Sequence, residues 1–98
     1  MLTGNERDEA LTALPRWRLS ADGRKIERSL RFADFTTAFA FMTEIARVAE
    51  AMDHHPDWSN CHARVEICLS THDAGGLTRL DIDMAHAIDR AAQSTELL

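Results

Sequence analysis

Residues 53–81 read DHHPDWSNCHARVEICLSTHDAGGLTRLD, and the fold has to be built around this stretch. Residues 64–70 alternate apolar and polar side chains, which predicts a half-buried strand. Residues 58–61 predict a shorter strand, joined to the longer one by a tight turn near His62. The inward side chains of the longer strand are expected to be Val65, Ile67 and Leu69. The stretch is therefore a pair of strands with one loop before it and another after it.

A helix is expected before this pair of strands. Asp34 can cap its first turn, and the helix runs to about Met52. Pro56 disfavours helical geometry at His55, so the helix has to end before the two adjacent histidines and leave both on a connection. Its apolar positions recur at helical spacing and predict one broad buried face, made of Phe35, Ala38, Phe39, Met42, Ile45, Ala46 and Ala49.

A second helix is expected after the strands. Residues 71–77 form a loop, after which Thr78 and Asp81 fit a capping box that opens a helix to about Gln93. Its inward face is predicted to contain Leu80, Met84, Ala87, Ile88 and Ala91. Residues 94–98 are expected to fray.

The chain begins with a short helix in this interpretation. Thr3 and Glu6 fit another capping box, for a helix over about residues 5–13 that Pro15 stops. Its inward side chains are expected to be Leu2, Ala10, Leu11 and Leu14.

Two alternating segments follow, at residues 17–21 and 26–32, and the dipeptide Asp22-Gly23 between them is a strong hairpin signal. Arg28 shares the parity of the inward residues, so we expect it near a sheet edge with its charged head in water. The element order is α-β-β-α-β-β-α. It predicts a single α+β domain over residues 1–98, with a four-stranded antiparallel sheet and helices packed on one face.

The composition narrows the classes of function. A net charge of −5 disfavours binding to a nucleic-acid backbone, and no segment approaches the ~20 apolar residues of a membrane span. The polar, acidic start does not have the pattern of a signal peptide, so we expect a cytoplasmic protein. Cys61 and Cys68 are expected to be reduced thiols packed in strands, although a disulfide between them is conceivable.

Three of the five histidines lie in the two loops that flank the strands, namely His54, His55 and His72. Imidazole is the side chain whose unperturbed pKa of about 6.5 allows proton transfer near neutrality. The pattern therefore indicates an acid–base site. For a flat ligand, we also expect Trp58 to form a wall of the pocket. His62 and His86 are expected to be structural or solvated. A metal site formed by Asp53 with the three histidines is the first alternative, although no recognised ligand spacing is present.

These motifs resemble a known family. Residues 50–58, EAMDHHPDW, and residues 70–81, STHDAGGLTRLD, are similar to pterin-4a-carbinolamine dehydratase, and the similarity extends over nearly the whole chain. The resemblance implies dehydration of 4a-hydroxytetrahydropterin to quinonoid dihydropterin, a step that recycles the pterin cofactor of aromatic amino acid hydroxylases. It also implies a small α+β fold and a homodimer or homotetramer. Ala51 is a departure, because many members carry lysine there.

By motif position, the resemblance implies that His54, His55 and His72 are the active-site histidines. It places Pro56, Thr71, Asp73 and Ala74 in segments that line the pterin pocket, and Asp81 at a position associated with the site.

The residues themselves add a division of roles. We expect His54 and His72 to form the acid–base pair, in an order left open, and His55 to orient the substrate or carry charge. Asp81 has a structural role in its capping box already. Glu50 opposes the helix dipole in a last turn, which fits either a supporting role or a solvated residue. No metal or redox cofactor is expected, because both steps are proton transfers.

An interaction module is the second alternative. Some animal members of the family assist the dimerisation of a homeodomain transcription factor. Nothing in this sequence encodes a partner surface, and turnover that requires the histidines would favour the enzyme.

Overall fold

The computed structural model of the chain describes residues 1–97 and confirms the predicted α-β-β-α-β-β-α order. The elements are α1 (Gly4–Thr12), β1 (Arg18–Leu19), β2 (Ile26–Arg31), α2 (Phe35–Met52), β3 (Asp57–Cys61), β4 (Arg64–Leu69), the 3₁₀ turn η1 (His72–Ala74) and α3 (Arg79–Ala92). β1 is shorter than the predicted strand, but the hairpin at Asp22-Gly23 is present, with Gly23 at φ +73°. In the part of the chain that is described, no helix is long and apolar enough to cross a membrane.

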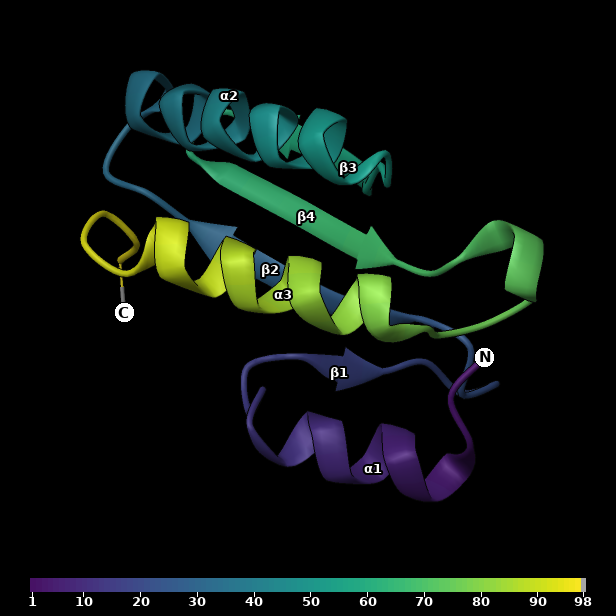
Figure 1. The fold of residues 1–98 in the computed structure, drawn as a ribbon. Helices are drawn as coiled ribbons and strands as arrows, with labels where there is room; N and C mark the ends of the chain where they lie inside the picture. The colour runs from purple at the N-terminus through teal and green to yellow at the C-terminus, as the bar shows by residue number, and fades with distance from the viewer. Residues whose placement is uncertain (98) are drawn as a thin grey trace.

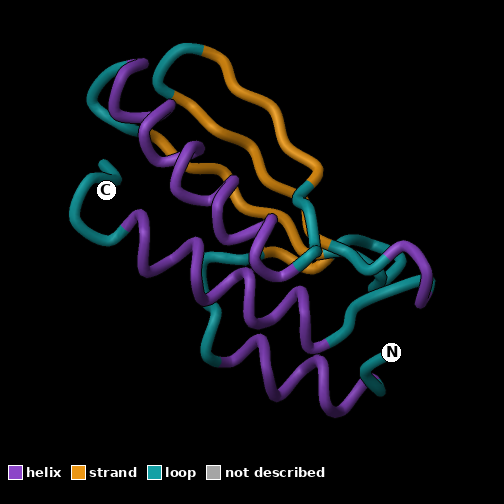
Figure 2. The backbone as a smooth tube through the Cα atoms, turned by 45° about the horizontal axis from the view of Figure 1, so that its top comes forward, coloured by secondary structure: helices purple, strands orange, loops and turns teal. Residues whose placement is uncertain are grey.

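The four strands form one antiparallel sheet in the order β1-β2-β4-β3. The register places Arg28 opposite Ile67 and Ile67 opposite Trp58, so these three side chains share one face of the sheet. The helices cover that face (Figures 1 and 2). The other face of the sheet carries mainly polar side chains. The core lies between the sheet and α2 with α3. Its largest fully buried side chains include Phe32, Leu14, Ile26, Leu30, Ile45, Leu69, Ile82, Met84 and Ile88.

The buried face of α2 differs from the prediction. Phe35 and Phe39 are 51% and 53% exposed, and Phe41 is buried in their place, with its ring centroid 4.9 Å from that of Phe32. The buried positions of the helix are Ala38, Phe41, Ile45 and Ala49. Ala46, also predicted inward, is exposed. The helix is apolar over more than one face, so periodicity selected the wrong aromatic residues, and contact with the sheet decides which of them are buried.

The buried face of α3 is also rotated from the predicted one. Leu80 is 40% exposed, whereas Ile82 and Ala85 are buried beside the correctly predicted Met84 and Ile88. The capping box of Thr78 and Asp81 forms as predicted, and Asp81 is itself 0% exposed.

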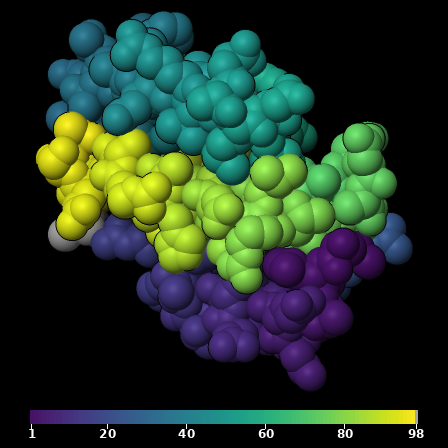
Figure 3. Space-filling model, viewed as in Figure 1, coloured from purple at the N-terminus to yellow at the C-terminus, as the bar shows by residue number. Residues whose placement is uncertain are grey.

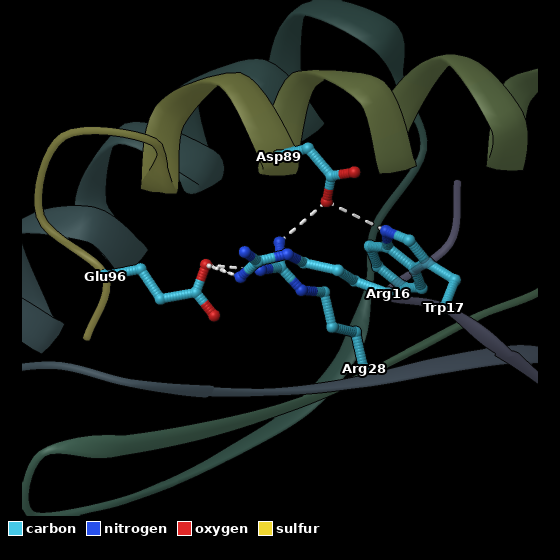
Figure 4. A network of polar contacts seen from close by, with 5 residues as sticks. All are labelled: Arg16, Trp17, Arg28, Asp89 and Glu96. Carbon is cyan, nitrogen blue, oxygen red and sulfur yellow. Dashed lines mark hydrogen bonds and ion pairs between the residues drawn. The ribbon is translucent and has the colours of Figure 1, made fainter. Parts of the chain in front are cut away.

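The prediction that the charged head of Arg28 lies in water near a sheet edge is wrong. β2 is an interior strand, and Arg28 is only 5% exposed, with its guanidinium between two carboxylates (Figure 4). One nitrogen donates to Asp89 at 2.7 Å and another to Glu96. Asp89 also accepts the indole N–H of Trp17 at 2.9 Å. The cluster therefore joins β2, α3 and the segment after α3.

Residues 94–97 were predicted to fray, and the structure contradicts this. Glu96 pairs with Arg28 and Arg16, and the Leu97 N–H donates to the Arg31 carbonyl at 2.7 Å. Leu98 lies outside the described residues.

The N-terminal segment packs beside α3 and the loop before it (Figure 3). The Thr3–Glu6 capping box is present, and the Leu2 N–H donates to the Leu77 carbonyl at 2.8 Å. Leu2, Ala10 and Leu11 are half-buried against the core, and Leu14 is fully buried, in agreement with the prediction.

Candidate functional site

The two histidine-bearing loops lie at the same end of the sheet. β3 begins where β4 ends, because Asp57 pairs with Cys68 in the ladder. The last turn of α2, η1 and the first turn of α3 lie at this end as well (Figure 1). The fold therefore brings the loops together as the sequence suggested.

The end of α2 is a Schellman motif that turns the chain sharply toward α3. Asp53 adopts the left-handed conformation at φ 49°, and its N–H donates to the Glu50 carbonyl at 3.3 Å. The next N–H, that of His54, donates to the Ala49 carbonyl at 3.0 Å. Aspartate tolerates this conformation better than most residues. The turn leaves His54 buried and His55 exposed.

His54 and Asp81 form a buried pair. The imidazole Nε2 lies 2.7 Å from Asp81 Oδ1, and the side chains are 9% and 0% exposed. The sequence placed both residues in the site but did not predict their direct contact. Asp81 thus serves two functions, since its other oxygen closes the capping box.

Two threonines complete the surroundings of Asp81. Its Oδ2 accepts the Thr71 hydroxyl at 2.7 Å and the Thr78 N–H at 2.9 Å. The two hydroxyls are 2.6 Å apart. Thr78 was predicted only as a helix cap, and its link to the site was missed. The capping box itself was the available signal, because it fixes where the Asp81 carboxylate must lie.

His55 lies on the outer side of the same loop. Its Nε2 is 2.6 Å from Glu50 Oε2, with side chains 59% and 77% exposed. An exposed pair of this kind contributes little to stability, about 0–1 kcal/mol. The pair places a carboxylate next to the second histidine while Glu50 stays largely solvated, so Glu50 has features of both roles expected for it.

His72 is exposed on η1 and makes no hydrogen bond with His54 or His55 among the described residues. It directly follows Thr71, whose hydroxyl bonds Asp81. Asp73 is exposed and Ala74 half-buried on the same turn, which ends at Gly75 with φ +71°. A side chain would be strained there, so glycine suits the position.

The remaining predicted residues lie nearby on the strand side of the loop. Pro56 and Trp58 are half-buried, and Trp58 packs against the core on the helix-covered face of β3. Ala51 is exposed in the last turn of α2.

The candidate site contains no metal-ligand cluster among the described residues, and a groove elsewhere on the molecule is structural. Within residues 1–97, no three histidine, cysteine, aspartate or glutamate side chains are arranged to hold a metal ion, so the alternative built on Asp53 and the histidines lacks a ligand set. A groove of about 260 Å³ lies at the Arg28 cluster. Its charged side chains are already paired with one another, which is the arrangement of a structural cluster.

Comparison with known proteins decides the family. Residues 1–91 match the sequence model of the family described as pterin 4 alpha carbinolamine dehydratase. The chain belongs to this family. A relative from Rhizorhabdus wittichii is 56% identical over 93 residues, covering 94% of this chain and 95% of its own. One from Burkholderia vietnamiensis is 51% identical over 94 residues, covering 96% and 92%. Both are named "Putative pterin-4-alpha-carbinolamine dehydratase".

Two solved structures agree with the fold. A Brucella melitensis protein described as a transcriptional coactivator/pterin dehydratase is 49% identical, with a TM-score of 0.87 over 93% of this chain and 97% of its own. A pterin dehydratase-like protein identified as a RuBisCO assembly factor in the alpha-carboxysome has a TM-score of 0.69 at 20% identity, over 80% and 90% of the chains. At that identity, the second likeness concerns the fold alone.

Proposed function

We propose that the protein is a dehydratase that converts a 4a-hydroxytetrahydropterin to quinonoid dihydropterin and water. The observation that carries the proposal is the buried pair of His54 and Asp81, 2.7 Å apart, in a chain of the pterin-4a-carbinolamine dehydratase family. A buried carboxylate that holds an imidazole is a common way of preparing a histidine for proton transfer.

The reaction consists of two proton transfers and the rupture of one bond. The C4a hydroxyl takes up a proton and departs as water, while N5 loses its proton and forms a double bond to C4a. No electron is gained or lost by the enzyme. Each positioned acid or base contributes typically about 10²–10⁴-fold.

The histidines divide these tasks. We assign the acid–base pair to His54 and His72, which lie on the two loops at one end of the sheet. His55, paired with Glu50, is the third histidine and orients the substrate or carries charge.

The flat pterin ring would lie along the exposed side of this end. The binding residues are Pro56 in the loop before β3, Trp58 in β3 itself, and Thr71, Asp73 and Ala74 in the loop after β4. The Thr71 hydroxyl is already bonded to Asp81, so its contribution to binding would come from its backbone or methyl group.

The cellular setting is part of the proposal. Both transfers involve only protons, so we propose that the enzyme requires no metal or redox cofactor. We further propose a cytoplasmic homodimer or homotetramer, linked in function to an aromatic amino acid hydroxylase through the shared pterin. The interaction module remains the competing function, since it would retain the fold without turnover.

A direct assay of carbinolamine dehydration tests the proposal. The decay of a 4a-hydroxytetrahydropterin is followed with and without protein, and the uncatalysed rate is subtracted. His54→Ala and His72→Ala should each remove most of the catalysis, and the double variant should cost little more, because groups that act together are non-additive. Exhaustive chelation should leave the rate unchanged.

His62→Asn is the matched control. His62 occupies the turn between β3 and β4, at the other end of these strands, and its φ of 52° is one that asparagine tolerates. Its rate should stay within about twofold of wild type. Absence of turnover in folded wild-type protein would refute the enzyme and favour the interaction module. Near-wild-type rates in both histidine variants would refute the assignment of the pair.

A further inference from the structure

With Asp81 ionised, the hydrogen bonds around it have only one consistent direction. An ionised carboxylate accepts and cannot donate, and its two oxygens here meet three polar groups: the Thr71 hydroxyl, the Thr78 N–H and the His54 Nε2. The single hydroxyl hydrogen of Thr71 therefore points to Asp81. The contact of 2.6 Å between the two hydroxyls must then be a bond from Thr78 to Thr71.

The same reasoning extends to the imidazole. Asp81 Oδ1 accepts, so the Nε2 of His54 has to be the nitrogen that carries hydrogen. In a neutral ring the other nitrogen, Nδ1, then has a free lone pair. Nδ1 has no hydrogen-bond partner among the described residues, and none of their buried side-chain nitrogen or oxygen atoms lacks one. It follows that Nδ1 is not fully buried, although the ring as a whole is buried.

We infer that Thr78, Thr71 and Asp81 form a directed chain that fixes the neutral tautomer of His54. The hydrogen lies on Nε2, and Nδ1 is the atom presented to the substrate. Thr71, Thr78 and Asp81 are positioning residues, and His54 is the catalytic one. The inference rests on the proposed function for its catalytic meaning, and it assigns to Nδ1 the proton transfer that His54 performs.

The hydrogen-bonded chain also accounts for contacts of Asp81 that helix capping does not require. Capping alone needs one oxygen of Asp81 and the hydroxyl of Thr78. It does not need a hydrogen bond from the half-buried Thr71 or an imidazole on the second oxygen. Bonds linked in this way strengthen one another when water is excluded. The burial of Asp81, which is 0% exposed, meets that condition.

Nuclear magnetic resonance of the ring nitrogens tests the tautomer without any assay of activity. Long-range proton–nitrogen spectra are recorded on the wild type at alkaline pH, where an ordinary imidazole is neutral. His54 should show a protonated Nε2 and an unprotonated Nδ1. The opposite pattern in the wild type would overturn the inference, because Asp81 would then be the donor.

Asp81→Asn should invert the tautomer. The amide oxygen has to occupy the Oδ2 position, since two donors meet there, and the NH₂ group then donates to Nε2. The hydrogen of the neutral ring is forced onto Nδ1. The capping box keeps its acceptor, so the variant should fold. Dehydration should fall by about 10²–10⁴-fold, the usual effect of losing one acid–base group.

Thr71→Val and Thr71→Ser separate the hydroxyl from the shape of the side chain. Valine should broaden the tautomer population and reduce the rate, whereas serine should restore both. Thr43→Val is the matched control, because Thr43 donates only to the Phe39 carbonyl of its own helix at 2.9 Å. An unchanged tautomer in both Asp81→Asn and Thr71→Val would overturn the inference. A wild type without turnover would refute the proposed function, while the spectra would still decide the tautomer.

Discussion

Replacement of Arg28 by methionine should destabilise the protein strongly. The side chain is 3% exposed, and its two partners, Asp89 and Glu96, are 27% and 10% exposed. Methionine fills similar volume but leaves two carboxylates near each other without the buried cation. Loss of one partner from a buried ion pair costs about 3–5 kcal/mol. Asp89 keeps its hydrogen bond from the Trp17 indole and remains partly exposed to water. We therefore expect a loss of unfolding free energy at the lower end of this range, about 3 kcal/mol.

Urea unfolding followed by tryptophan fluorescence measures this cost, since the Trp17 indole is bonded to Asp89. A domain of this size loses about 4–8 °C of Tm per kcal/mol, so a fall of about 12 °C or more should accompany the change. Glu96→Gln combined with Arg28→Met should cost less than the sum of the single changes, because the two residues share one interaction.

Arg18→Met is the matched control for the same substitution. Arg18 is 81% exposed on β1 and pairs with Glu27, itself 39% exposed, at 3.2 Å. Such a surface pair contributes about 0–1 kcal/mol. If Arg28→Met is no more destabilising than Arg18→Met, then the cluster in Figure 4 is not a stabilising element and the reasoning fails.

Three further predictions concern other parts of the molecule. Burial raises the pKa of the Cys68 thiol, so alkylation at pH 8 should modify exposed Cys61 first, and mass spectrometry of the labelled peptides that finds Cys68 first would contradict this. Hydrogen bonds from Thr37, through its side chain and then its N–H, lower the pKa of Asp34 below 3.8. The folded pKa is below the unfolded one, so the stability Asp34 adds is present above pH 3.8 and is lost as the pH falls further. The stability difference between wild type and Asp34→Ala, measured by urea unfolding, should therefore shrink in acid, and a constant difference would exclude the linkage. The edge of β3 carries unpaired backbone groups, so light scattering should find an oligomer, and a species of 11.0 kDa at micromolar concentration would count against it.

The parts of the fold that the sequence predicts are those with local causes. Both capping boxes, the Asp22-Gly23 hairpin and the turn at His62 depend on residues within a few positions of one another, and all are present. The end of α2 before the histidine pair follows from Pro56 in the same way.

The predictions that fail are those in which the burial of a side chain depends on residues far away in the sequence. Arg28 lies on the face of the sheet that its parity predicts, but its burial depends on carboxylates 61 and 68 residues away. The same holds for α2, where Phe39 and Phe41 are chemically alike and only the position of the sheet distinguishes them.

The candidate site lies between these cases. The three histidines and Asp81 could be chosen from motifs, and the loops do meet at one end of the sheet. The contact of His54 with Asp81 spans 27 residues and depends on how α2 and α3 dock, which no local pattern encodes.

The position of β4 between β2 and β3 bears on how fast the chain can fold. The two hairpins close over short turns, whereas the central ladder pairs Ile26 with Leu69 and Arg31 with Arg64 across the whole of α2 and β3. Closing so long a loop lowers the entropy of the chain before the stabilising contacts of the ladder have formed. If α2 forms early, its 18 residues span a fixed length of about 27 Å and shorten the search between the two hairpins. The helix that ends just before His54 would then also set the distance between the two hairpins and so favour the correct pairing of β2 with β4.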